Sequence, residues 1–304
     1  MGEESKARPR LCGSVLGWAR QINVAEYQGL TPFPADRTPR ERLDEAPART
    51  SCAAAAVVVV TVVFFSVLGL FAGGFFQVPL WALGVLAGLV AVAVAIGSPP
   101  AQHVTILCLL AGLAYRTPGL GMHPFPLMSA LMGYGLVALA SRMLRETVGW
   151  PHTGSLARDV RRLVIVVSFA SIVTLPLWRL LAEPDVTLAT ELIADLPTGA
   201  LPAVGLAFAI VNAGVEEAAF RGVLMDSLRS AVGVWGALVL QAAAFGLVHY
   251  AHGVPNGLIG AVISGIYGLA FGLARLRASG MLAPWIAHAV TDLAVFVLLV
   301  VWGR

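Results

Sequence analysis

Charged residues are scarce in this sequence. Asp, Glu, Lys and Arg make up 12% of the 304 residues, whereas hydrophobic residues make up 58% and the mean hydropathy is +0.82. Soluble domains carry about 25% charged and under about 50% apolar residues, so the composition argues against a water-soluble fold. Cysteine is scarce too, because Cys12, Cys52 and Cys108 lie far apart without C-x-x-C spacing. This pattern indicates neither a redox motif nor a zinc–thiolate site.

Long apolar runs stand in place of charge. They follow one another from Ala53 to the C-terminus, and each approaches the roughly 20 residues that a helix needs to cross about 30 Å of hydrocarbon. The predicted transmembrane helices cover residues 53–76, 78–97, 101–115, 126–142, 162–182, 200–229, 232–250, 255–275 and 281–302. The sequence therefore predicts an all-α, polytopic transmembrane helical bundle of nine spans, or eight if the short third run does not cross.

The positive charges indicate the orientation of the chain. The net charge is +3, and the basic residues fall in short segments between apolar runs. Most of the 20 Lys and Arg, including Arg221 and Arg275, lie on the cytosolic side if the N-terminus is in the cytosol. Membrane topology therefore explains the charge, and no nucleic acid partner is expected. We predict a partly disordered cytosolic tail over residues 1–50, transmembrane helices over 51–199 and a catalytic transmembrane core over 200–304.

Few ionisable residues lie at membrane depth. Such groups cost roughly 2.5 to 3.5 kcal/mol each on insertion scales and usually mark a functional site. They are Glu216, Glu217, His249, His252, His288 and Asp292. If the sixth and seventh spans turn near residues 230–233, Glu216 and His249 lie roughly 22 and 26 Å from that turn at 1.5 Å per residue. We therefore expect these two side chains to meet.

Spacing within each helix predicts shared faces. Glu217 precedes Arg221 by four residues, so the two can form an ion pair that leaves the neighbouring acid for chemistry. His288 and Asp292 are also four apart and lie on one face. Phe245 lies one turn before the first site histidine and is expected to wall the same pocket.

Three short motifs carry a family resemblance. EEAAFR (residues 216–221), FGLVH (245–249) and HAVTD (288–292) resemble, in order and spacing, the signatures of the CPBP family. That family comprises the type II CAAX prenyl proteases and the bacteriocin-processing, Abi-like intramembrane proteases. The likeness covers roughly residues 200–300. It implies an intramembrane glutamic endopeptidase with a conical catalytic cavity in the C-terminal helices.

The resemblance also implies roles for the site residues. Glu216 is expected to act as general base on a water that His249 helps to position and activate. His288 and the residue four positions later would stabilise the tetrahedral oxyanion. Many family members carry Asn at that later position, where this chain has Asp292. An ionised Asp cannot donate to an oxyanion, so Asp292 must be protonated, orient His288 or bind something positive.

No cofactor is expected, although a metal is the harder alternative. Glu216, His249, His288 and Asp292 include ligand types that zinc accepts, and the family has been called a metalloprotease. However, the sequence has no H-E-x-x-H helix, and the family's later description is metal-independent. The expected partners are the lipid bilayer and a membrane protein or peptide substrate, cleaved in a C-terminal tail or leader. We expect a prokaryotic cytoplasmic membrane.

Two other classes of function stay open. A proton-coupled carrier could use intramembrane Glu and His as a relay, and a non-catalytic scaffold or immunity protein could retain the same fold. His252 is expected at the rim of the site. His103, His123 and His152 are expected in loops beside Pro or Gly, and no chemistry is predicted for them.

Overall fold

The computed structural model describes residues 51–71, 78–120, 123–182, 184, 186–251 and 253–303. Within these ranges the chain forms helices and turns without a β-strand. The predicted tail, residues 1–50, and His252 lie outside them. The first helices are α2 (Cys52–Phe71), α3 (Leu80–Ala95), α4 (Pro99–Arg116), α5 (Phe125–Ala140) and α6 (Arg142–Thr147). They are followed by α7 (Arg158–Ala182), α8 (Thr187–Ala194), η4 (Thr198–Ala200), α9 (Leu201–Glu217), η5 (Ala218–Leu224), α10 (Met225–Ala251), α11 (Gly257–Ala278) and α12 (Leu282–Gly303).

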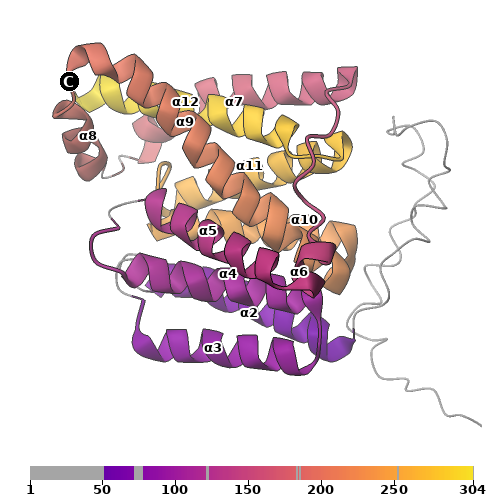
Figure 1. Cartoon of the computed structure of the whole chain (residues 1–304). Coiled ribbons are helices and arrows are strands. Elements are labelled where there is room, and N and C mark those ends of the chain that lie inside the picture. Colours follow the sequence, from indigo (N-terminus) through magenta and orange to yellow (C-terminus); the bar gives the residue numbers. More distant parts are fainter. Residues whose placement is uncertain are drawn as a thin grey trace, which may run out of the picture. The chain divides into compact units, whose positions relative to one another are not determined.

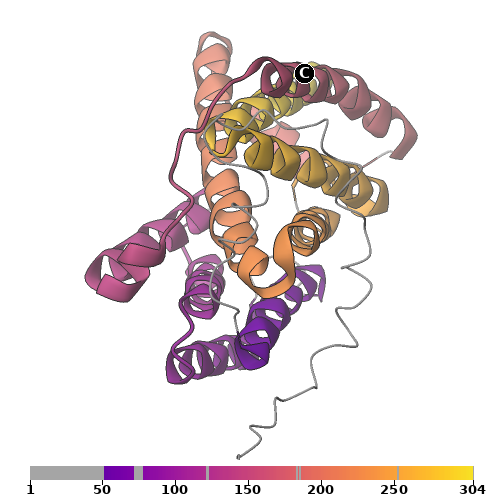
Figure 2. The same ribbon diagram turned by 90° about the vertical axis from the view of Figure 1, so that its right-hand side faces the viewer.

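Two groups of helices meet at α10. Helices α2, α3, α4 and α5 pack side by side, whereas α12 packs against α7, α9 and α11 (Figure 1). Helix α10 contacts α2 and α4 on one side and α11 on another. Figure 2 shows α10 and α11, in orange, between the indigo α2 and the yellow α12. The described residues of the predicted parts 51–199 and 200–304 therefore lie in direct contact within one compact unit.

The described helices are suited to a lipid surrounding. Four helical runs are long and apolar enough to cross a membrane, namely Arg158–Ala182, Thr198–Tyr250, Gly257–Ala278 and Leu282–Trp302. Helices α2, α3 and α5 are shorter and apolar. Large apolar side chains cover the outside of α7, where Ile165 and Phe169 are 65% and 67% exposed. Such a surface would drive aggregation in water, whereas hydrocarbon solvates it.

The run Thr198–Tyr250 doubles back at Gly233. This residue interrupts α10 with φ 79° and ψ 177°, a conformation that glycine adopts more readily than any residue with a Cβ. The rings of Phe220 and Phe245, which lie on opposite sides of Gly233, have centroids 5.1 Å apart. The predicted turn between two spans is therefore confirmed, and it brings the first two motifs face to face.

Helix α4 begins earlier than predicted and contains His103. Ser98 caps it by accepting from the backbone N–H of Ala101, and two prolines occupy the first turn, where no N–H is needed. The prediction of His103 as a loop residue is wrong. Its ring is buried and lies 2.9 Å from the Thr147 hydroxyl through Nε2 and 2.8 Å from the Tyr134 hydroxyl through Nδ1.

The stretch between the predicted spans 162–182 and 200–229 contains the short helix α8. Eight residues are too few for a helix that forms on its own in water, so composition gave no sign of it. Helix α8 packs against α12, and its Ile193 is buried in that contact region. Tertiary packing therefore stabilises this short helix.

Candidate active site

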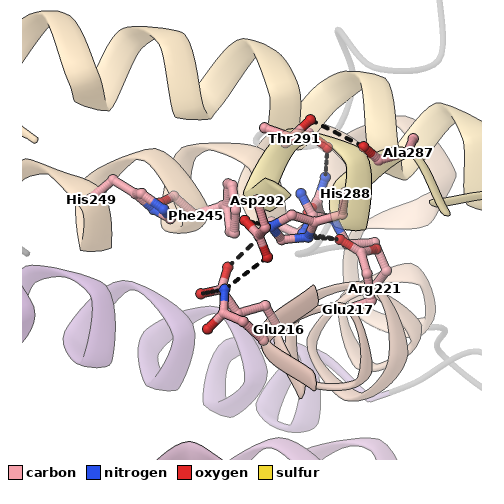
Figure 3. A network of polar contacts seen from close by, with 12 residues as sticks. Glu216, Glu217, Arg221, Phe245, His249, Ala287, His288, Thr291 and Asp292 are labelled. Atoms are coloured by element: carbon pink, nitrogen blue, oxygen red, sulfur yellow. Dashed lines mark hydrogen bonds and ion pairs between the residues drawn. The ribbon is translucent and has the colours of Figure 1, made fainter. Parts of the chain in front are cut away.

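Two of the three sequence motifs, EEAAFR and HAVTD, meet in one buried polar cluster, and the third, FGLVH, lies at its margin (Figure 3). The motif residues in the cluster come from α9, η5 and α12. Glu216, Glu217, Arg221, His288 and Asp292 are 6%, 1%, 0%, 3% and 7% exposed. Burying an ion is expensive unless it is paired and hydrogen-bonded, so the contacts within the cluster decide whether these charges are tolerated.

Glu217 links two of the motifs. Its Oε1 accepts from Arg221 Nη1 at 2.8 Å and from His288 Nδ1 at 2.7 Å. The predicted pairing of Glu217 with Arg221 is confirmed, and the arginine side chain is fully buried. The placement of Arg221 on the cytosolic side stays a prediction. Glu217 therefore also orients His288, a contact that spacing within one helix could not reveal.

His288 is held by aromatic rings and directed at two carboxylates. Phe271 stacks on it at a centroid distance of 4.7 Å, and Phe245 meets it edge-on at 5.7 Å. Its Nε2 lies 3.5 Å from both Glu216 Oε2 and Asp292 Oδ1. With Nδ1 bound by Glu217, the ring presents Nε2 to the space between these acids.

Glu216 is bound through one oxygen. Its Oε1 accepts from His123 Nε2 at 2.7 Å and from Asn212 Nδ2 at 3.2 Å. Asn212 Nδ2 also donates to Asp292 Oδ2 at 3.0 Å. In the described part of the chain, Glu216 Oε2 has no hydrogen-bond donor. The carboxylate is thus fixed by Oε1 while Oε2 lies toward His288.

Sequence reasoning missed two residues of this cluster. Asn212 stands four positions before Glu216 in an otherwise apolar helix, and this spacing was a usable signal. His123 was assigned no chemistry, because it lies in a turn and 93 positions from its partner. Only the fold brings it to the carboxylate.

His249 lies at the margin of the cluster. Its Nδ1 donates to the backbone carbonyl of Phe245 at 2.9 Å, and its ring lies 4.5 Å from that of Phe245. Figure 3 shows the Phe245 ring between His249 and His288, so Phe245 contacts both site histidines, as expected of a pocket wall. Glu216 and His249 interact electrostatically, but Glu216 forms its hydrogen bonds with His123 and Asn212.

The segment η5 is a π-helical turn, Ala218–Leu224, and it carries Arg221. Turns of this kind inside α-helices recur at functional sites. Here the turn places the guanidinium over the ring of Phe245 at 4.3 Å and over that of Phe271 at 5.1 Å. The arginine therefore contacts both rings that hold His288 as well as Glu217.

The described residues contain no group of three or more His, Cys, Asp or Glu side chains arranged to hold a metal ion. The zinc alternative predicted from Glu216, His249 and His288 needs a common ligand position, yet His249 lies beyond the Phe245 ring and His288 Nδ1 is taken by Glu217. Metal dependence stays a question for experiment.

The apolar helices and their exposed apolar side chains define an integral membrane protein. Residues 198–294 match the model of the family described as Type II CAAX prenyl endopeptidase Rce1-like. This match confirms the resemblance predicted from the three motifs, and it supports an enzyme of the protease type. No curated protein and no solved structure matches the chain.

Proposed function

We propose that this protein is an intramembrane endopeptidase that hydrolyses a peptide bond in the C-terminal tail or leader of a membrane-associated protein or peptide. The observation that carries the proposal is the convergence of Glu216, His288 and Asp292 in one buried cluster. The segment that holds all three lies within the Rce1-like match. Peptide hydrolysis requires a base that activates water and donors that stabilise the oxyanion, and this cluster contains groups of both kinds.

Glu216 is proposed as the general base. Since Oε1 is occupied by two donors, Oε2 takes a proton from water as the water oxygen attacks the substrate carbonyl carbon. His249, through the ring edge not bonded to Phe245, helps to position that water. The same proton then passes from Glu216 to the leaving amine as the carbon–nitrogen bond breaks.

His288 and Asp292 are proposed to stabilise the oxyanion. Three carboxylates and one guanidinium surround His288, so charge balance favours an imidazolium that donates from Nε2. The 3.5 Å distances from Nε2 are long for charge-assisted hydrogen bonds, which leaves this nitrogen available to a developing oxyanion. Asp292 orients His288 from one side, and Glu217 with Arg221 orients it from the other.

The topology is proposed to follow the positive-inside rule, with a cytosolic N-terminus and eight or nine spans in a prokaryotic cytoplasmic membrane. Support comes from segments predicted on the cytosolic side, which gather around one cavity of about 650 Å³. Its lining includes Ser51, Gly97, Trp150, Asp226 and Ser230. This cavity is distinct from the conical catalytic cavity that the family resemblance predicts, which remains part of the proposal.

The test compares membrane peptides and C-terminal tails in cells that express the wild-type protein, Glu216→Gln or Glu146→Gln. Glu146 is an exposed acid paired with Arg142 and serves as the matched control. The expected result is a set of cleavage products that disappears only with Glu216→Gln. Products that persist in this variant at normal expression refute the proposal. Because a proton-coupled carrier would also lose its function, cleavage itself is the readout, and a chelator added to the reconstituted reaction tests metal dependence.

A further inference from the structure

A hydrogen-bonded chain runs from α4 to Glu216. The Tyr115 hydroxyl lies 2.8 Å from His123 Nδ1, and His123 Nε2 lies 2.7 Å from Glu216 Oε1. The rings of Tyr115 and His123 are parallel to within 3°. A carboxylate can only accept, so Nε2 carries a proton, and a neutral ring then accepts from the tyrosine at Nδ1. Tyr115 therefore selects the tautomer that donates to Glu216.

The location of this chain distinguishes it from the rest of the site. Tyr115 and His123 lie outside residues 198–294, the segment that matches the family model, and outside the three motifs. Tyr115 is 5% exposed, whereas the His123 side chain is 36% exposed. The buried tyrosine thus fixes a histidine at the edge of the cluster, and the N-terminal helices supply a donor that the C-terminal core lacks on this side.

The geometry at Oε1 shows what the donor does. Asn212, one turn earlier on α9, is the second donor to this oxygen, and its amide nitrogen also donates to Asp292. His123 provides the shorter of the two contacts. With both donors on Oε1, the free lone pairs of Oε2 face His288.

We propose that His123 is a positioning residue for peptide hydrolysis, and that Tyr115 acts through it by fixing its tautomer. The role rests on the proposed function, because it directs which oxygen of Glu216 takes the proton from water. Loss of a bond that only stabilised the turn before α5 would lower thermal stability and leave kcat of the folded enzyme unchanged. This difference makes the role testable.

The experiment uses the purified full-length protein. The substrate is a synthetic peptide that spans a cleavage site identified in the assay above. His123→Ala is expected to lower kcat about 10- to 100-fold with little change in KM, the range seen when an orienting hydrogen-bond partner of a site residue is lost. His123→Gln keeps an N–H donor at similar reach and should retain kcat within about threefold of wild type, given that its donor is preserved.

Tyr115→Phe provides the second measurement and removes a single hydroxyl. It should lower kcat several-fold with His123 in place and have no further effect in the His123→Gln background, because an amide has no tautomer to select. Size-exclusion profiles and thermal unfolding establish that each variant is folded.

The outcomes separate the two hypotheses. Glu216-dependent cleavage with His123→Ala at the wild-type rate overturns the role of His123 and leaves the proposed function standing. Equal losses in folded His123→Ala and His123→Gln also overturn it, because the donor would then be irrelevant. Absence of any Glu216-dependent cleavage refutes the proposed function and this role together.

Discussion

Replacing Arg221 by methionine should destabilise the protein far more than replacing an arginine with the same local pairing at the surface. Arg221 is fully buried, and its Nη1 lies 2.8 Å from Glu217 Oε1 four residues earlier. Arg142 pairs with Glu146 across the same spacing and the same 2.8 Å distance, but the two side chains are 83% and 59% exposed. The acid precedes the base in the first pair and follows it in the second, an effect of about a few tenths of a kcal/mol, so burial is the main difference between the two pairs.

The magnitudes follow from that difference. Removing one partner of a buried ion pair costs about 3 to 5 kcal/mol because the other charge loses its compensation, and here His288 would be left to balance three carboxylates. Methionine restores much of the apolar volume beside Phe245, so the loss of the charge dominates. An exposed helical pair contributes only about 0.3 to 0.5 kcal/mol, and Arg142→Met should cost no more. The double variant Arg221→Met with Glu217→Gln removes both charges and keeps an oxygen for His288, so it should recover about 1 to 3 kcal/mol.

The assay is equilibrium unfolding in mixed micelles, followed by tryptophan fluorescence and circular dichroism, for the wild type and the variants with changes at positions 221, 217 and 142. If Arg221→Met lowers the free energy of unfolding by less than about 1 kcal/mol, breaking the buried pair does not leave a costly unpaired charge, and the reasoning is refuted. Losses from Arg221→Met and Glu217→Gln that simply add would show that the two side chains are not coupled.

Two other predictions concern packing and the oxyanion site. A Cβ on Gly280 would overlap the backbone of Gly154, so Gly280→Ala should lower the unfolding free energy by about 1 to 3 kcal/mol. A Cβ on Gly84 meets nothing within 4 Å, so Gly84→Ala should leave the thermal stability unchanged or slightly higher. Similar losses of stability in both variants would contradict the clash. Asp292→Asn keeps an oxygen that can accept from Asn212 and should remain active. Asp292→Leu should lower the cleavage rate about 100-fold, as loss of oxyanion stabilisation does. If Asp292→Leu cleaves at the wild-type rate in a single-turnover assay, this side chain has no role in the reaction.

Most helices were predictable from apolar runs, because lipid requires each span to satisfy its own backbone hydrogen bonds over a fixed length. The turn at Gly233 was predictable for the same reason, since the run Thr198–Tyr250 is far longer than one crossing needs. Helix α8 was not, because packing against α12 stabilises it. The apolar periodicity of a segment does not show which distant segment of the chain will pack against it.

The site shows the same division. The pairs Glu217 with Arg221 and His288 with Asp292 could be predicted, because residues four apart on a helix are neighbours. The contact of Glu217 with His288 could not, since it depends on how α9 and α12 pack. His123 was the hardest to find, because a histidine in a turn has no periodicity and its partner is remote in sequence.

The π-helical turn Ala218–Leu224 also determines how the faces of α9 and the first part of α10 are rotated relative to each other. Each residue of an α-helix adds about 100° of rotation, and a π-turn takes one extra residue to close its hydrogen bonds. The buried faces before and after this turn are therefore offset by about one residue. A single-residue deletion that closed this segment into a regular α-helix would keep the flanking faces in phase, but it would remove the turn that places Arg221 over the rings of Phe245 and Phe271. Insertions and deletions in these seven residues should consequently be tolerated far less than those in the loops.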